Sequence, residues 1–404
     1  MARSPLPLTV PVAIVGGGPA GLTAAIALAG AGIETALIAR PTAPDHRTTA
    51  LLAGSVTALE VLGVWPHCRP HAAPLKTMRI VDNTGRLIRA PEVSFEAGEI
   101  GLDAFGHNIE NRHLLQALDA RAGDLASLKR IEGEAREVEI GADGIVVHLS
   151  GGGRIEARLA IGADGRNSLS RAAAGIETDS SRYDQYALTF NLRHTRPHRD
   201  TSTEFHTPHG PFTLVPLPDL RSSLVCVTSS NDAELLEAMD DGELAQEIER
   251  RSHSILGKIA IEPGRGVFPL AVETARRFAA NRIVLVGESA HAMPPIGAQG
   301  LNLGLRDAAT IAELVVEAHR NDGDPGAPDL MSCYDALRRA DVKSRTFAVD
   351  LINRTLLSNF LPVQSARGLG LYLIDRIGPL RRAVMREGVG PSVAQPRLMR
   401  GELL

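Results

Sequence analysis

Short apolar runs separated by a glycine-rich turn dominate the first forty residues. VAIV (Val12–Val15) has the length of a buried strand, and TALIA (Thr35–Ala39) is a second run of the same kind. Between them, the Ala- and Leu-rich segment Leu22–Ala31 has the composition of a helix and ends at Gly32. The pattern predicts a strand, a turn, a helix and a second strand.

Two later segments repeat the passage from an apolar strand into a helix. In residues 157–171 the apolar run ARLAIG leads through a Gly-Ala-Asp-Gly turn into a short helix. In residues 282–309 the strand Ile283–Val286 ends at Gly287-Glu288, and a loop rich in Gly and Pro leads to a helix beginning near Leu301. Apolar residues recur in that helix with a period of about 3.6, which predicts one buried face.

The hydrophobic pattern changes between residues 176 and 269, where apolar and polar residues alternate. This alternation is typical of antiparallel strands that bury one face. An acidic helix is predicted over Asp232–Arg251, and Lys76–Arg89 reads as a hairpin of the same sheet with its turn at Asn83–Gly85.

These patterns divide the chain into an α/β unit, an inserted antiparallel sheet and a helical tail. We expect the α/β unit over residues 8–75, 105–175 and 270–340. The inserted sheet is expected over 76–104 and 176–269, and the helical C-terminal segment over 341–404.

Composition and charge exclude several classes of protein. With 404 residues, 44% hydrophobic and 22% charged, the chain is typical of a folded protein of two or three domains. The formal net charge of −4 lacks the basic excess of a nucleic-acid binder. The three cysteines are far apart and favour a reducing cytoplasm over a disulfide framework or a metal site. Residues Ser4 to Ile33 carry no charge, but the central GGGPAG favours a strand–turn–helix over a targeting or membrane segment.

The spacing Gly16-x-Gly18-x-x-Gly21 between strand and helix predicts a dinucleotide-binding turn. The first glycine permits the tight turn, the second lets a diphosphate approach the backbone, and the third lets the helix pack on the strand. The helix N-terminus adds free N–H groups. The motif leaves NAD and FAD open, and Ala39, followed by Arg40, stands where the ribose-binding acid is expected.

The ends of the three strands are expected to meet at one ligand. Asp164 and Glu288 each follow an apolar strand, where a carboxylate can bind a ribityl hydroxyl. Gly297 and Gly300 let the chain pass close to a flat ring. The helix that follows offers N–H groups that stabilise negative charge on a reduced flavin, so the pattern favours FAD.

GGGPAG, GADGRNS and VGESAHAMPPIGAQGLNLGLRDA resemble the three fingerprints of the single-component FAD aromatic hydroxylases, above all the ubiquinone-biosynthesis hydroxylases. RTTALL, which begins at Arg47, and NRHLLQAL, which contains Arg112, are similar to FAD-contact segments of that family. The C-terminal RGLGLYLIDRIGPLRRAVM resembles its tail. The resemblance implies the p-hydroxybenzoate-hydroxylase-like fold: a three-layer, Rossmann-like α/β FAD-binding domain with an inserted antiparallel-sheet substrate domain and a helical C-terminal tail.

The resemblance also implies an activity. It is hydroxylation of the aromatic ring of a polyprenylated phenol in ubiquinone biosynthesis, with tightly but non-covalently bound FAD, and with NAD(P)H and O₂ reacting through a flavin hydroperoxide. No second Gly-x-Gly-x-x-Gly follows a strand, so NAD(P)H is expected to dock transiently at the flavin. The residues implied to contact FAD are Gly16, Gly18, Pro19, Ala20, Gly21, Arg40, Arg47, Arg112, Asp164, Gly287, Glu288, Pro295, Gly297, Gln299, Gly300, Leu301 and Asn302.

The chain departs from the family pattern at three places. Glu288 replaces the usual Asp and is one methylene longer, roughly 1.5 Å of extra reach. The usual Ala-Gly-Gln-Gly is here Gly297-Ala298-Gln299-Gly300, which moves a glycine by one position. Ala39 replaces the usual Glu. These changes bear on FAD affinity more than on the fold.

No residue stands out as the catalytic acid or base. His291 and Pro295 are the candidates because the third fingerprint contains them, whereas His206, His209 and His253 read as residues of the inserted sheet or of the surface. Two other functions stay open: a flavin-dependent prenyl-chain reductase, and a non-catalytic flavin-fold subunit of a quinone-biosynthesis complex.

The C-terminal segment is basic and amphipathic. From Arg338 to Leu404 there are twelve Lys/Arg and five Asp/Glu, a net charge of +7. An apolar helical stripe, broken by Gly378-Pro379, is formed by Leu369, Leu373, Ile377, Leu380 and Val384. Packing on the flavin domain, contact with a partner subunit or a second copy, and peripheral contact with the inner face of an anionic membrane all fit this pattern.

Overall fold

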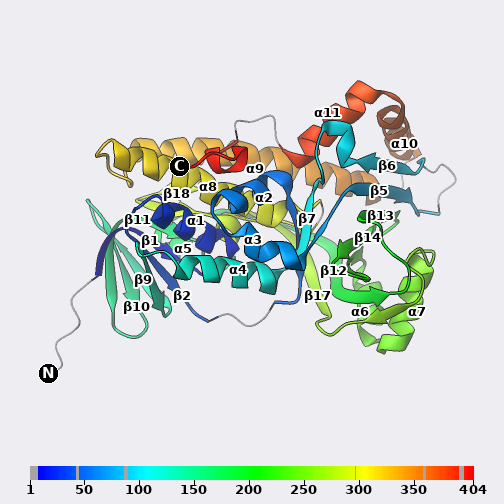
Figure 1. The fold of residues 1–404 in the computed structure, drawn as a ribbon, viewed down its shortest axis with the longest axis horizontal. Coiled ribbons are helices and arrows are strands. Elements are labelled where there is room, and N and C mark those ends of the chain that lie inside the picture. The colour runs from blue at the N-terminus through cyan, green and yellow to red at the C-terminus, as the bar shows by residue number, and fades with distance from the viewer. Residues whose placement is uncertain (1–7, 42–44, 86–89, 296, 358–360, 391–394) are drawn as a thin grey trace.

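The computed structural model describes residues 8–41, 45–85, 90–295, 297–357, 361–390 and 395–404. Figure 1 shows two sheets side by side, with a long helical segment running along both of them. The first sheet carries the glycine-rich turns, and the second lies toward the far end of the molecule.

The first sheet is mainly parallel and follows the order β18-β19-β11-β1-β2-β8. Its parallel strands are β1 (Leu8–Val15), β2 (Thr35–Ala39), β8 (Leu128–Glu132), β11 (Arg154–Gly162) and β19 (Ile283–Leu285). Antiparallel strands extend it: β18 (Ala279–Ala280), β9 (Ala135–Ile140) and β10 (Ile145–Leu149).

The uncharged N-terminal stretch forms the centre of this first sheet. In β1, Val12, Ala13 and Ile14 are fully buried between neighbouring strands. Helix α1 (Pro19–Gly30) is buried from Ala20 to Ala29, so apolar residues are required all around it. The predicted strand–turn–helix–strand is confirmed, with the helix starting three residues early because Pro19 occupies its first turn.

The second sheet is mainly antiparallel, as predicted, and has the order β20-β17-β12-β15-β14-β13-β5-β6, with β16 beside β12. Its strands are β5 (Thr77–Asp82), β6 (Val93–Glu96), β12 (Thr178–His194), β13 (Thr201–Thr207), β14 (Gly210–Leu217), β15 (Arg221–Thr228), β16 (Ile259–Ile261), β17 (Gly266–Ala275) and β20 (His291–Ala292).

Two local predictions in this second sheet need correction. The acidic helix is divided into α6 (Ser230–Ala238) and α7 (Asp241–Arg251), because Asp240 caps the second helix by accepting from the Glu243 N–H. Strand β5 pairs with β6, beyond the predicted return arm. Residues 86–89 of that arm lie outside the described residues.

A small third sheet contacts β14 of the second sheet through β4 and β7. Its strands are β3 (Thr48–Leu52), β7 (Gly106–Glu110) and β4 (Ala72–Pro74). Helices around it and the first sheet are α2 (Ala53–Val61), α3 (Trp65–Cys68), α4 (Asn111–Gly123) and α5 (Leu169–Ala173), with short 3-10 turns η1 (Arg69–His71) and η2 (Ala97–Ile100). This arrangement brings the segments of Arg47 and Arg112 together, because Asn111 N–H donates to the Arg47 carbonyl.

The C-terminal part is helical but does not form one separate unit. After the 3-10 turn η3 (Gly287–Ser289) come α8 (Gln299–Arg320), α9 (Pro328–Leu357), α10 (Leu361–Arg376) and α11 (Gly378–Val389). Helix α9 continues through the expected boundary at 340/341. The final turn η4 (Arg397–Arg400) returns to α2 and α8, and it buries Leu398 and Met399 in the core of the first sheet.

Candidate active site

The first two glycine-rich turns are in close backbone contact. Gly16 has φ +115°, and a Cβ there would lie 2.2 Å from the Ala163 carbonyl oxygen. A Cβ on Gly21 would lie 2.1 Å from the Gly16 carbonyl oxygen. Glycine is therefore required at both positions so that β1, α1 and the end of β11 can meet.

The third turn joins the same point. Gly287 has φ +64°, and a Cβ built there would approach the Ala20 methyl to 3.2 Å. The Ser289 hydroxyl donates to the Gly162 carbonyl at 2.6 Å, and the Arg171 guanidinium donates to the Ser289 carbonyl at 2.9 Å. The predicted meeting of the three strand ends is thus present in the fold.

Gly18 differs from Gly16 and Gly21 because its missing Cβ points into open space. Apart from Gly18 and the two residues adjoining it, no atom lies within 4 Å of that Cβ position, and the backbone is extended, with φ −72° and ψ 174°. No side chain caps the first N–H groups of α1, which Pro19 opens. This cradle fits a diphosphate: it is open, lined by backbone and placed at a positive helix end.

Charged and aromatic side chains from separate elements extend from this turn to the second sheet. The Glu288 carboxylate is 59% exposed and lies 3.6 Å from Arg166 Nε. The Arg47 guanidinium lies 5.6 Å from the centre of the Phe268 ring, and Asp45 holds it through bonds of 2.7–3.1 Å. The side chains of Glu288, Arg47 and Arg166 therefore remain accessible to a ligand on this side of the turn.

Two predicted contact residues use their side chains inside the protein. The Asp164 carboxylate accepts from the Ser168 hydroxyl at 2.5 Å and the Ser170 N–H at 2.9 Å, which orders the turn into α5. The buried Asn302 amide accepts from the Leu52 N–H and the Ser55 hydroxyl, and donates to the Ala50 and Ala298 carbonyls. In this structure Asp164 orders the second glycine turn, and Asn302 ties the start of α8 to β3 and α2.

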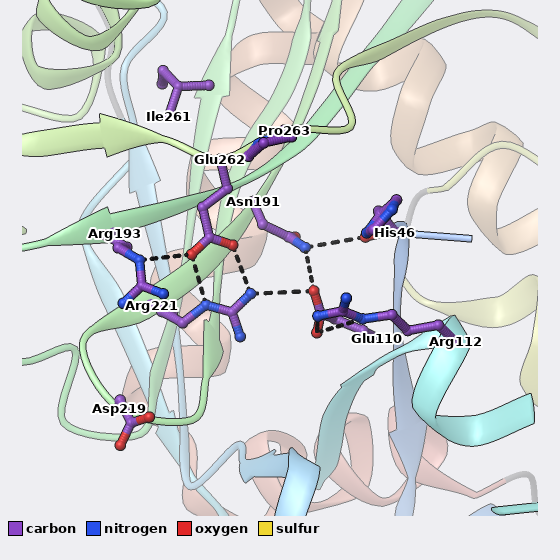
Figure 2. A pocket seen from close by; sticks show the side chains of 10 residues that line it. All are labelled: His46, Glu110, Arg112, Asn191, Arg193, Asp219, Arg221, Ile261, Glu262 and Pro263. Carbon is purple, nitrogen blue, oxygen red and sulfur yellow. Dashed lines mark hydrogen bonds and ion pairs between the residues drawn. The ribbon is translucent and has the colours of Figure 1, made fainter. Parts of the chain in front are cut away.

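The remaining predicted arginines, Arg40 and Arg112, each pair with a carboxylate. Arg40 is exposed and pairs with Glu134 at 3.1 Å. Arg112 donates to Glu110 at 2.8 Å and lines a cavity of about 590 Å³ between the end of β7 and the second sheet. Figure 2 shows the side chains that line this cavity, with Arg221 between Glu262 and Glu110.

Acidic and basic side chains that line the cavity pair with one another. Buried Glu110 accepts from Asn191 at 2.8 Å and pairs with Arg221 at 3.2 Å, while Arg221 also binds Glu262 at 2.6 Å (Figure 2). Burial raises the pKa of Glu110, but the hydrogen bond from Arg112 and the charge of Arg221 together lower it below its usual value. Each of these carboxylates has an arginine partner, so the network ties β7 to β12 and β15.

The loop before α8 has an unusual backbone. Pro295 and Gly297 are exposed, and Gln299 Nε2 donates to the Gly297 carbonyl at 3.0 Å. Gly297 has φ +67° and Ala298 has φ +54°. Gly300 would admit a Cβ without contact, whereas half-buried Leu301 packs on the core. The left-handed residue Ala298 occupies the position where the family pattern has glycine.

We expect Ala298→Gly to stabilise the folded protein by roughly 1 kcal/mol, because it removes the cost of a left-handed alanine. The gain should appear in urea unfolding of the ligand-free protein as a higher midpoint at an unchanged slope. The control is Ala292→Gly, at a buried β20 strand position without positive φ, which should destabilise. A lower midpoint for Ala298→Gly would contradict the strain at this loop.

His291, a catalytic candidate from the sequence, is inaccessible in this structure. Its side chain is fully buried, and Nε2 lies 2.6 Å from Asp307 Oδ2. The same carboxylate oxygen accepts the Gly287 N–H at 3.0 Å, and Oδ1 accepts from Arg338 Nε at 2.6 Å. His291 thus holds Asp307, which in turn holds the third glycine turn.

Sequence reasoning missed the rest of this buried network. Arg338 and Arg306 each donate to Asp341 Oδ2 at 2.7 Å, linking α9 to α8. Burial raises the pKa of Asp307, but the charges of His291 and Arg338 bring it down to about 2. A signal was present: Arg306 and Asp307 are charged residues within the otherwise largely apolar run of α8, and buried charges require partners.

Comparison with known proteins places this architecture in a family. Residues 9–346 match the family model described as FAD binding domain. The chain is 36% identical over 401 residues to ubiquinone hydroxylase UbiL of Rhodospirillum rubrum, covering 96% of this chain and 92% of that protein. It is 32% identical to 3-demethoxyubiquinol 3-hydroxylase of Escherichia coli, covering 94% of this chain and 98% of that protein.

Solved structures share the fold. A p-nitrophenol 4-monooxygenase from Pseudomonas putida superimposes with a TM-score of 0.79 at 17% identity, covering 96% of this chain and all of that one. Klebsiella pneumoniae HpxO, crystallised with FAD and uric acid, gives a TM-score of 0.74 at 18% identity, covering 94% and 96%. The expected combination of an α/β FAD-binding fold with an antiparallel sheet is confirmed, and this chain belongs to the FAD-binding family of flavoprotein monooxygenases.

Proposed function

We propose that this protein hydroxylates the aromatic ring of a polyprenylated phenol in ubiquinone biosynthesis, with FAD as cofactor and NAD(P)H and O₂ as co-substrates. One oxygen atom of O₂ enters the ring, the other leaves as water, and NAD(P)H supplies the two electrons. The carrying observation is the open Gly18 cradle, built where three glycine-rich turns meet next to an antiparallel sheet. The names of the two curated relatives support the substrate class.

The residues of this chain have three tasks in the proposed reaction. The Gly18 backbone and the N-terminus of α1 would hold the FAD diphosphate, and Glu288 would face the ribityl chain. Bound FAD supplies the electron transfer and oxygen activation that no side chain can provide. The second sheet, which brings Phe268 to Arg47, would orient the ring and exclude water. His291 is committed to Asp307, so the structure does not support its use as a proton relay.

The direct test is turnover of a short-chain prenylated phenol by the FAD-loaded protein. We expect NAD(P)H and O₂ to be consumed together, and ¹⁸O from ¹⁸O₂ to appear in a hydroxylated ring. A prenyl-chain reductase would instead saturate a double bond without consuming O₂. A non-catalytic subunit would bind FAD and consume neither co-substrate. Accumulation of a quinone precursor after gene deletion would then identify the ring position.

A prediction on Glu288 tests the assigned ribityl contact. Glu288→Ala should weaken FAD binding roughly ten- to a hundredfold, because a hydrogen bond to a charged group contributes about 1.5–3 kcal/mol. Glu288→Asp, which restores the family residue, should preserve or improve affinity. Dissociation constants from quenching of flavin fluorescence provide the measurement. Equal constants for the three proteins would show that this side chain does not contact FAD.

A further inference from the structure

The predicted apolar stripe of the C-terminal segment lies on the surface. We define the C-terminal apolar face as Leu369, Tyr372, Leu373, Ile377, Leu380 and Val384. These six side chains are 38–58% exposed, although each is large and apolar. They come from α10, from α11 and, for Ile377, from the single residue between them, where the chain breaks before Gly378-Pro379 as predicted. They recur three or four residues apart, as on one side of a helix, and large apolar side chains exposed together in this way mark an interaction site.

Packing within the chain uses a different side of α11. Arg381 binds the Glu99 carboxylate at 2.6 and 2.8 Å, donates to the Ser94 carbonyl, and lies 4.6 Å from the Phe95 ring centre. Met385 is buried in a cluster with Val93, Phe95 and Phe105. The helix is thus anchored to η2 and β6 through residues outside the apolar face. In the part of the chain that the structure describes, the face itself remains exposed.

Charge around the face is positive. Arg376, Arg382 and Arg386 are exposed on the same two helices, and the Arg376 guanidinium lies 5.4 Å from the centre of the Tyr372 ring. The acids of this stretch have basic partners: Asp375 lies 3.4 Å from Arg381, and Glu387 pairs with Arg345 at 2.9 Å. An apolar face flanked by arginines is complementary to an anionic bilayer surface.

We infer that the C-terminal apolar face docks this protein onto anionic membrane. The described helices include none long and apolar enough to cross a bilayer, so the contact is peripheral. Because α11 is anchored on η2 and β6, docking would hold the edge of the second sheet near the lipid (Figure 1). This role rests on the proposed function, since a polyprenylated phenol is dissolved in the bilayer.

Point variants are the appropriate test, because deletion from residue 367 onward would also remove the core residues Leu398 and Met399. We would compare the FAD-loaded full chain with the double variant Leu373→Ser/Leu380→Ser. Leu235→Ser is the matched control, since Leu235 is 64% exposed on α6 at a distance from the face in sequence and fold. The probes are vesicles of phosphatidylcholine alone and of phosphatidylcholine mixed with phosphatidylglycerol.

Wild type and Leu235→Ser should sediment with the mixed vesicles, and binding should fall as salt is added. The double variant should bind at least tenfold more weakly. Arg382→Gln/Arg386→Gln should lose most of the preference for anionic lipid. Equal binding by wild type and the leucine variant would overturn the inference. So would a wild-type dimer that the leucine variant converts to a monomer without changing vesicle binding, because a second copy would then cover the face.

Turnover of a short-chain phenol without vesicles separates this inference from the proposed function. The leucine variant should retain that turnover, since its substitutions lie outside the candidate active site. Vesicle binding without hydroxylation by any of the proteins would preserve the docking surface and reject the proposed reaction. Hydroxylation without vesicle binding would support the proposed reaction and reject the docking surface.

Discussion

Gly18→Val should abolish FAD binding while leaving the protein folded. A side chain at Gly18 would occupy the space that the diphosphate needs. In the FAD-free fold, no atom outside the adjoining residues lies within 4 Å of the Cβ position, so the side chain itself fits. The backbone at Gly18 is extended, with φ −72° and ψ 174°, which also suits a β-branched residue. Overpacking by the side chain and the loss of N–H contacts to the diphosphate should together cost roughly 3 kcal/mol or more of binding free energy. This corresponds to at least about a hundredfold loss of affinity. The visible flavin spectrum after purification is the first measurement.

Gly21→Ala is the matched comparison. Its new methyl group would lie 2.1 Å from the Gly16 carbonyl oxygen, so this variant should destabilise the FAD-free protein itself. Circular dichroism and thermal unfolding of both FAD-free variants would therefore separate a blocked ligand from a damaged fold. A Gly18→Val protein that stays yellow and active would remove the first turn from the FAD site.

Asp307→Asn should lower the free energy of unfolding by about 3–5 kcal/mol, because it removes one partner of a buried ion pair. The substitution leaves the buried Arg338 without one of its two carboxylates and weakens the bond to the Gly287 N–H. Urea unfolding of the FAD-free protein should show the loss directly. Since Gly287 belongs to the third turn, FAD affinity should fall in the same variant.

Glu317→Gln on the same helix provides the control, because that side chain is exposed and its loss should change stability by less than about 0.5 kcal/mol. The difference between wild type and Asp307→Asn should also depend on pH. The folded-state pKa of Asp307 is lowered to about 2 from 3.8, so its contribution is complete above about pH 4 and disappears as the pH falls toward 2. A pH-independent loss would point to packing instead of charge.

The local elements of the first sheet could be predicted because short-range sequence determines them. An apolar strand, a turn that needs glycine at Gly16, and an Ala-rich helix each have a signature within a few residues. The third fingerprint was equally visible, yet the geometry of its loop was not. Only the backbone shows that Ala298 adopts φ +54°, because no local signal marks an alanine in a left-handed conformation.

The roles of individual polar residues required the tertiary structure. His291 lies in a fingerprint and suggested chemistry, but its partner Asp307 is sixteen residues away and that partner's arginine comes from another helix. Asp164 and Asn302 were predicted to contact FAD, and in this structure their side chains bind neighbouring backbone and hydroxyl groups. Partner choice depends on which elements meet in space, and composition or spacing does not encode that directly.

In the C-terminal segment, the sequence determined the local pattern and the tertiary structure decided which side is buried. By itself, the sequence determined an amphipathic, basic, broken helix, because periodicity and the Gly378-Pro379 break are properties of neighbouring residues. It left open whether the apolar stripe is buried. The tertiary structure decided this, because η2 and β6 pack against the side of α11 that carries Arg381 and Met385. The stripe is left exposed because a helix can bury only the side that its neighbour covers.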